Sequence, residues 1–114
     1  MKNIYITIAG TKFQCGAFWM KEGLKVKLIK EPDNDFDKEA IRVEAEGIGK
    51  IGYVANSVKT VVGNCMSAGR LYDRIGDEAE AKVKFILSDS RVICKIRKRS
   101  IIYDPDICVE EYNE

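Results

Sequence analysis

The sequence contains no histidine, and its four cysteines are far apart. Without histidine, the chain lacks the commonest general base and one of the commonest metal ligands. No pair of cysteines has the close spacing of a zinc knuckle, so no structural metal site is expected. We interpret the cysteines as reduced, mostly buried small hydrophobic residues; they are Cys15, Cys65, Cys94 and Cys108.

The chain also lacks any apolar run near the roughly 20 residues that a membrane-spanning helix needs. Its first ten residues, MKNIYITIAG, do not have the basic-then-apolar layout of a signal peptide. We therefore expect a cytoplasmic protein that uses neither a membrane nor a disulfide. The phosphate-binding motif GxxxxGK[ST] is missing, and so is any nucleophile motif. We expect a non-enzymatic protein with no cofactor.

The 114 residues are 46% hydrophobic and 32% charged, which is typical of one globular domain. Residues 1–100 hold all 19 basic residues against 13 acidic ones, a net charge of +6. The end of the chain holds five acidic residues and no basic one. We expect a single domain over residues 1–103, mildly basic and so able to attract a phosphate backbone, followed by an acidic tail over 104–114.

Alternation of apolar and polar residues predicts the strands. They are expected at residues 3–9, 24–28, 40–45 and 48–54, and in a hairpin of 81–87 and 92–96 whose inward residues include Phe85. The segment 15–20 can continue as a strand or cross over as an aromatic loop, with Phe18 and Trp19 as core residues.

The period changes after Val54. Apolar residues then recur at helical spacing, which predicts a helix beginning near Asn56 or Ser57, either of which can cap it, and ending at Gly69. The residues that define this spacing are Val54, Val58, Val61, Val62, Cys65 and Met66. About six short strands around one main helix indicate a mainly β fold, a small closed or half-closed barrel.

The most densely specified stretch is residues 28–54, in which an acidic loop joins two strands. Pro32 ends regular pairing because it has no N–H to donate. Asp33, Asn34 and Asp35 follow, and their short side chains stabilise turns. Gly47 then marks the turn of a hairpin.

Three segments in this order resemble the HIRAN domain family. Residues 31–43, EPDNDFDKEAIRV, are similar to the family's hallmark EPxNxYDxxAIxV. Residues 50–54, KIGYV, and residues 10–13, GTKF, resemble two further hallmarks. The resemblance spans about residues 3–70 and implies a six-stranded barrel related to the OB-fold, with helical additions.

The family occurs fused to SWI/SNF-type DNA-dependent ATPases and as stand-alone bacterial and phage proteins. The resemblance implies capture of single-stranded DNA at a free 3′ end. By position, Phe13 and Phe36 would sandwich the terminal base, Asp37 would accept a hydrogen bond from the 3′-hydroxyl, and Lys12 would meet the backbone. Any helicase or nuclease partner is expected to be a separate chain.

Two further positions match the site but carry different residues. Tyr53 stands where a DNA-end-binding member has a histidine that contacts phosphate, and Asn56 stands near a lysine position. These two departures leave a second hypothesis open, in which the barrel is a protein-interaction or scaffold module that no longer binds DNA. A hydrolase has the least support.

Each of these residues also has a purely structural interpretation. The aromatic side chains of Phe13 and Phe36 could cap the barrel, and Asp37 could accept from backbone N–H groups in its own loop. Acidic residues of the loop match positions of a calcium-binding loop, but Lys38 stands where that loop requires glycine; they are Asp33, Asp35, Asp37 and Glu44.

The densest basic cluster lies at the end of the last predicted strand, over residues 95–99. Its members, Lys95, Arg97, Lys98 and Arg99, could line a backbone groove with Lys12, Lys25 and Lys27. Alternatively, they guard an edge strand with charge.

Overall fold

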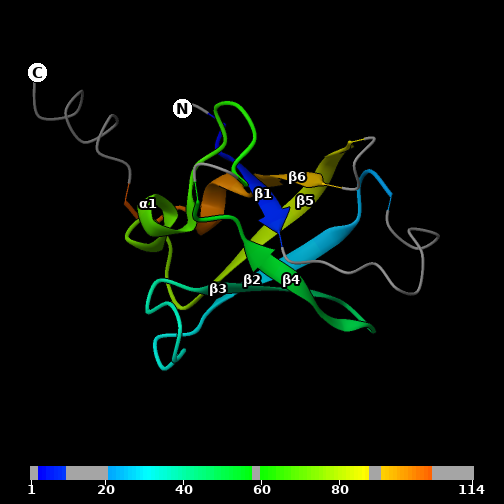
Figure 1. Cartoon of the computed structure of the whole chain (residues 1–114). Coiled ribbons are helices and arrows are strands. Elements are labelled where there is room, and N and C mark those ends of the chain that lie inside the picture. The colour runs from blue at the N-terminus through cyan, green and yellow to red at the C-terminus, as the bar shows by residue number, and fades with distance from the viewer. Residues whose placement is uncertain (1–2, 10–20, 58–59, 88–90, 104–114) are drawn as a thin grey trace, which may run out of the picture.

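The computed structural model describes residues 3–9, 21–57, 60–87 and 91–103 of the chain (Figure 1). Six antiparallel strands form a closed barrel in the order β1-β4-β3-β2-β5-β6, as the mainly β prediction required. The strands are β1 (Tyr5–Ala9), β2 (Lys25–Lys30), β3 (Ile41–Ala45), β4 (Gly49–Val54), β5 (Glu78–Ile86) and β6 (Val92–Ile96).

The barrel interior is filled by the apolar residues that alternate along the strands. Ile6 and Ile8 of β1, Leu28 of β2 and Val43 of β3 are almost completely buried. The residues between them face away from the interior, because successive side chains of a strand face opposite sides of the sheet. Thr7 on that other face is nevertheless buried, and its hydroxyl accepts from the N–H of Val62. The period-two pattern of the sequence therefore places the core correctly in the first three strands.

The hairpin of β5 and β6 departs from simple alternation at one point. The pairing register shifts between Val83 and Phe85, so Lys84 is the additional residue of a β-bulge. Beyond the bulge, Phe85 lies opposite Ile93 and is 52% exposed. The prediction that Phe85 faces inward is therefore wrong, because one inserted residue reverses the face of every residue after it.

The predicted helix over residues 56–69 is also wrong. Where this segment is described, it consists of turns and irregular backbone, and the helix α1 spans only Ala68–Tyr72. Gly69, which was predicted to end the helix, is its second residue. The predicted N-cap is wrong as well: Ser67 caps α1, and its hydroxyl accepts from the N–H of Arg70.

Hydrogen bonds to β1 explain why this segment is not helical. The N–H of Met66 donates to the carbonyl of Tyr5 at 2.7 Å, and the N–H of Val62 donates to the Thr7 hydroxyl at 3.1 Å. These donors would have to point at carbonyls four residues earlier in a helix. Gly63 has a φ of +51°, a left-handed conformation that interrupts a right-handed helix.

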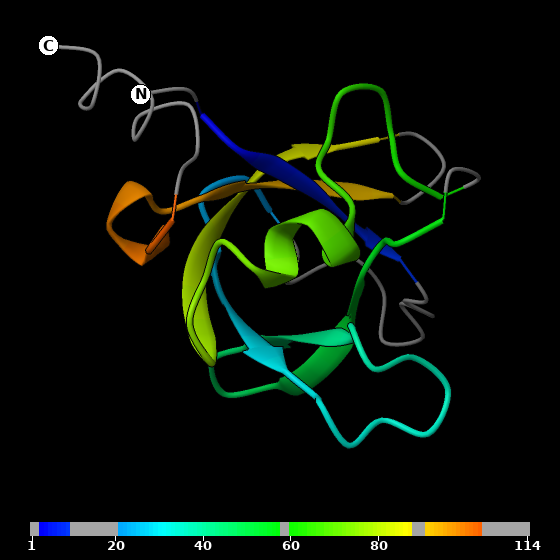
Figure 2. The same cartoon turned by 90° about the vertical axis from the view of Figure 1, so that its left-hand side faces the viewer.

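The helix α1 lies across one end of the barrel (Figure 2). Ala68 and Leu71 of α1 are fully buried, and Ile75 follows them into the core. A short 3-10 helix at Lys98–Ser100 follows β6, and Ile101 after it forms a bridge with Ile75.

Several predicted features lie outside the described residues: Lys12, Phe13, Cys15, Phe18, Trp19, residues 88–90 between the strands of the predicted hairpin, Cys108 and the 104–114 tail. Cys94 is fully buried, as predicted, and burial raises the pKa of its thiol to about 12, so the thiol stays protonated. Within the described residues, no helix has the length and apolar character needed to cross a membrane.

Candidate functional site

The loop between β2 and β3 projects from the barrel (Figure 2) and is held closed by its own hydrogen bonds. The N–H of Glu31 donates to the carbonyl of Ala40 at 2.9 Å, which joins the two ends of the loop. At the tip, Oδ1 of Asn34 accepts from the N–H groups of Phe36 and Asp37, at 2.8 and 2.9 Å. Asn34 therefore fixes the backbone of the two residues that follow it.

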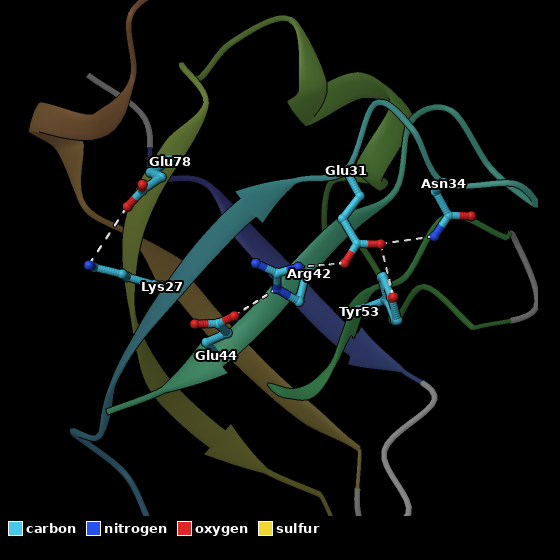
Figure 3. Close-up of polar contacts among 7 residues, drawn as sticks. All are labelled: Lys27, Glu31, Asn34, Arg42, Glu44, Tyr53 and Glu78. Atoms are coloured by element: carbon cyan, nitrogen blue, oxygen red, sulfur yellow. Dashed lines mark hydrogen bonds and ion pairs between the residues drawn. The ribbon is translucent and has the colours of Figure 1, made fainter. Parts of the chain in front are cut away.

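Glu31 connects this loop to the barrel wall (Figure 3). Its Oε1 accepts from the side-chain amide of Asn34 at 2.9 Å and from the Tyr53 hydroxyl at 3.0 Å. Its Oε2 pairs with Nη1 of Arg42 at 2.9 Å. The hydrogen bond from Asn34, helped by those from Tyr53 and Arg42, lowers the pKa of Glu31 below its ordinary 4.5 despite partial burial. Glu31 is the first residue of the motif at residues 31–43, but the sequence alone did not predict a role for it.

Arg42 is held on its other side by Glu44 of the same strand. Nε of Arg42 lies 2.7 Å from a Glu44 carboxylate oxygen, in the geometry of an ion pair rather than a hydrogen bond. With Glu31, this second carboxylate neutralises the guanidinium. Arg42 therefore orients the loop and has little charge left to offer a ligand.

Phe36 stands at the tip of the closed loop with its side chain 98% exposed. The structure therefore contradicts the alternative in which Phe36 caps the barrel. A fully exposed phenylalanine gains nothing from burial in the folded chain, so stability gives no reason for its presence. Because Asn34 holds the backbone at Phe36, the ring is presented from a fixed position.

Asp37 lies at the start of a chain of side-chain contacts that ends on α1. Its Oδ1 accepts from the N–H of Glu39 at 2.9 Å, and its Oδ2 accepts from the Asn56 amide at 3.1 Å. Oδ1 of Asn56 in turn accepts from the N–H of Gly69 at 2.8 Å. The loop-stabilising role of Asp37 is thus confirmed, and a carboxylate has lone pairs left for a further donor.

An open depression of about 460 Å³ lies beside this chain of contacts. Asp37, Tyr53 and Asn56 all line it, together with Ala9 at the end of β1. The fold therefore gathers three of the six predicted site residues, with Phe36 next to Asp37 in the chain. Lys12 and Phe13 follow Ala9 in the sequence but lie outside the described residues.

Comparison with known proteins identifies the fold family. The sequence model of the HIRAN domain family matches residues 1–98. The chain belongs to the HIRAN domain family. The crystal structure of the HIRAN domain of human HLTF is similar, with a TM-score of 0.54 and 17% identity over 86% of this chain and 78% of that one. No curated protein sequence matches the chain.

The HIRAN domain described here carries one cation near the depression that sequence reasoning missed. Lys50 of β4 places its ammonium 5.1 Å from the centre of the Tyr53 ring. In β4, Lys50 is opposite Glu44 and Gly52 is opposite Val43, so Ile51 is an additional residue. This irregularity puts Lys50 and Tyr53 on the same outer face, which simple alternation would not predict.

The residues of the predicted basic surface do not all line the same groove. Lys25, Lys95, Arg97 and Lys98 line one groove of about 420 Å³ on the wall formed by β2, β5 and β6. Lys27 and Arg99 are not among the residues that line it. Lys27 instead lies 3.7 Å from a carboxylate oxygen of Glu78 (Figure 3).

The acidic residues of the loop do not gather around a common point. Asp37 accepts from Glu39 and Asn56, and Glu44 pairs with Arg42. Among the described residues, no group of three or more acidic or cysteine side chains is placed to hold a metal ion.

Proposed function

We propose that this HIRAN domain is a binding module for single-stranded DNA that recognises a free 3′ end without a motor of its own. Phe36 stacks on a base, and Asp37 accepts a hydrogen bond from the terminal 3′-hydroxyl. Lys12 and Phe13 complete the site on the β1 side. A helicase or nuclease on another chain is the proposed protein partner of the module.

The full exposure of the Phe36 ring on a constrained loop carries this proposal. Stacking on an aromatic ring is worth about 1–3 kcal/mol per base and accepts any base, because every base has a π-face. Family membership supports nucleic acid as the ligand class. Asp37 suits a hydroxyl rather than a phosphate, because a carboxylate accepts hydrogen bonds and repels anions.

The contacts of Tyr53 change its expected role. Its hydroxyl proton is donated to Glu31, so the same proton is not available to a phosphate oxygen. We propose that Lys50, which lies over the Tyr53 ring, supplies the positive charge on this side of the depression.

The first test is a ligand comparison. We expect a short single strand with a 3′-hydroxyl to bind at least about tenfold more tightly than the same strand with a 3′-phosphate, which corresponds to about 1.4 kcal/mol. Fluorescence anisotropy at two salt concentrations measures the dissociation constants of both strands. A matched pair that differs only in a 5′-phosphate is the control, and its two members should bind equally. Equal binding of the 3′-hydroxyl and 3′-phosphate strands would contradict end recognition.

The protein-interaction hypothesis remains the second candidate, and one observation favours it. Both side chains at the departing positions, Tyr53 and Asn56, are engaged within the protein, with Glu31 and with Asp37 and Gly69. The hydroxyl proton of Tyr53 is thus committed to Glu31, and one of the two amide protons of Asn56 is committed to Asp37. Failure of every oligonucleotide to bind at low salt would favour this candidate over the first.

A further inference from the structure

Three lysines form one row across the outer wall of the barrel. Lys25 of β2 is directly opposite Lys82 of β5, and Lys82 is directly opposite Lys95 of β6. Residues paired in this way have Cβ atoms only about 4.5–5.5 Å apart, and like charges directly opposite each other destabilise a sheet. The fold therefore retains an arrangement that works against its own stability.

The neighbouring row on the same face is neutralised. Lys27 is opposite Glu80, and a Glu80 carboxylate oxygen lies 2.6 Å from Nη1 of Arg97. In the lysine row, by contrast, no ion pair is found with any described residue. The sequence thus places acidic partners in one row and omits them from the next, so the positive charge of the lysine row is left for an external anion.

An exposed aromatic residue, Phe85, follows the lysine row along β5, outside the lining of the groove. The β-bulge at Lys84 turns Phe85 onto the outer face, where it follows the Lys82 position along β5 and is 52% exposed. Without the bulge, alternation would bury this ring in the core. Tyr5 of β1 lies opposite Lys95, so the row continues from β6 onto β1.

The three lysines lie on strands that do not line the depression of the loop site. The depression is lined by residues of β1, β4, the segment after β4 and the loop between β2 and β3, whereas the lysines of the row belong to β2, β5 and β6. The row lines the groove of about 420 Å³, in which Glu80 is the single acidic residue among the described lining residues. Cations beside an exposed aromatic ring suit a ligand that carries both phosphates and flat bases.

We propose that the lysine row and Phe85 form a second binding surface for single-stranded nucleic acid. Lys25, Lys82 and Lys95 bind consecutive backbone phosphates, and Phe85 stacks on a base. An acidic peptide would use the lysines but would leave Phe85 without a partner. The inference rests on the proposed function in that its ligand is nucleic acid, but it does not require the Phe36 site.

The test compares two lysine variants that remove the same charge. Lys82→Gln should weaken binding of a 24-nucleotide single strand by a factor of about five and make its salt slope shallower by about 0.7. Lys27→Gln, the matched control on the neutralised row, should change neither. Phe85→Ala should weaken binding about fivefold or more without changing the salt slope. Equal effects of Lys82→Gln and Lys27→Gln would overturn the inference, because only net charge would then matter.

Thermal unfolding tests whether the weaker binding of Lys82→Gln comes from a loss of folding. The Tm of Lys82→Gln should rise by about 2–4 °C, because the substitution removes a like charge between two lysines. A fall in Tm together with weaker binding would overturn the inference, since the lysine would then have a structural role.

The same measurements in the Phe36→Ala background separate the two sites. If Phe36→Ala leaves binding unchanged while Lys82→Gln and Phe85→Ala weaken it, the loop site is wrong and the second surface stands. If only Phe36→Ala weakens binding, the second surface is wrong. Binding of poly-glutamate that depends on Lys82 but not on Phe85, with no binding of DNA, would overturn the inference in favour of an acidic protein partner.

Discussion

Phe36→Ala is expected to weaken binding of a short single strand by about 5- to 150-fold, the loss of one base stack worth about 1–3 kcal/mol. The free energy of unfolding should change by less than about 0.5 kcal/mol, because the side chain is 98% exposed and contributes no burial. Fluorescence anisotropy and urea unfolding measure the two quantities on the same preparations.

Two further variants make the Phe36 result specific. Phe36→Trp keeps a stacking surface and should retain most of the affinity. Ile48→Ala removes another exposed apolar side chain, in the turn between β3 and β4, and should leave binding unchanged. An unaltered dissociation constant for Phe36→Ala would exclude the stacking role of Phe36.

Glu31→Gln should lower the free energy of unfolding by about 2–3 kcal/mol at pH 7, because hydrogen bonds to charged groups are worth about that much. The carboxylate accepts from Asn34 and Tyr53 and pairs with Arg42. Gln can keep one acceptor oxygen, but its amide group would then face the guanidinium of Arg42, donor against donor. Urea unfolding measures the loss.

The lowered pKa of Glu31 gives this prediction a pH signature. Its pKa in the folded protein is below the ordinary 4.5, so the stabilisation is present above pH 4.5 and is lost as the pH falls through the folded value. The stability of Glu31→Gln should therefore depend less on pH below 4.5 than that of the wild type. If the stability of the wild type and that of Glu31→Gln changed in parallel below pH 4.5, a stabilising charge at Glu31 would be ruled out.

The matched control is Glu46→Gln, at an exposed carboxylate in the turn between β3 and β4. This substitution should change the free energy of unfolding by less than about 0.5 kcal/mol.

The strands and the loop at the site were predictable because their signals are local. Alternation along β1 identifies Ile6 and Ile8 as core residues, since the side-chain period of a strand depends only on its own backbone. Asn34 closes the loop through bonds to residues two and three positions later. The motif of residues 31–43 led to the HIRAN family, which the family match confirms.

The helix prediction failed for a reason that lies far away in the sequence. Helical spacing near Val62 and Met66 is real, but β1 offers their N–H groups hydrogen-bond acceptors, the Thr7 hydroxyl and the carbonyl of Tyr5. A backbone N–H group that already donates to β1 cannot also donate to the carbonyl four residues earlier, as a helix requires. The pattern along the segment carries no information about which strand will lie beside it.

The sequence by itself determined the six strands, the closed loop and the family, because each follows from periods and turn residues within a short stretch. Only the tertiary structure decided which side chains share a surface. Two irregularities in strand pairing moved Lys50 beside Tyr53 and turned Phe85 outward, and the strand order aligned Lys25, Lys82 and Lys95. Register and strand order are properties of pairs of strands, and a pattern within one strand cannot encode them.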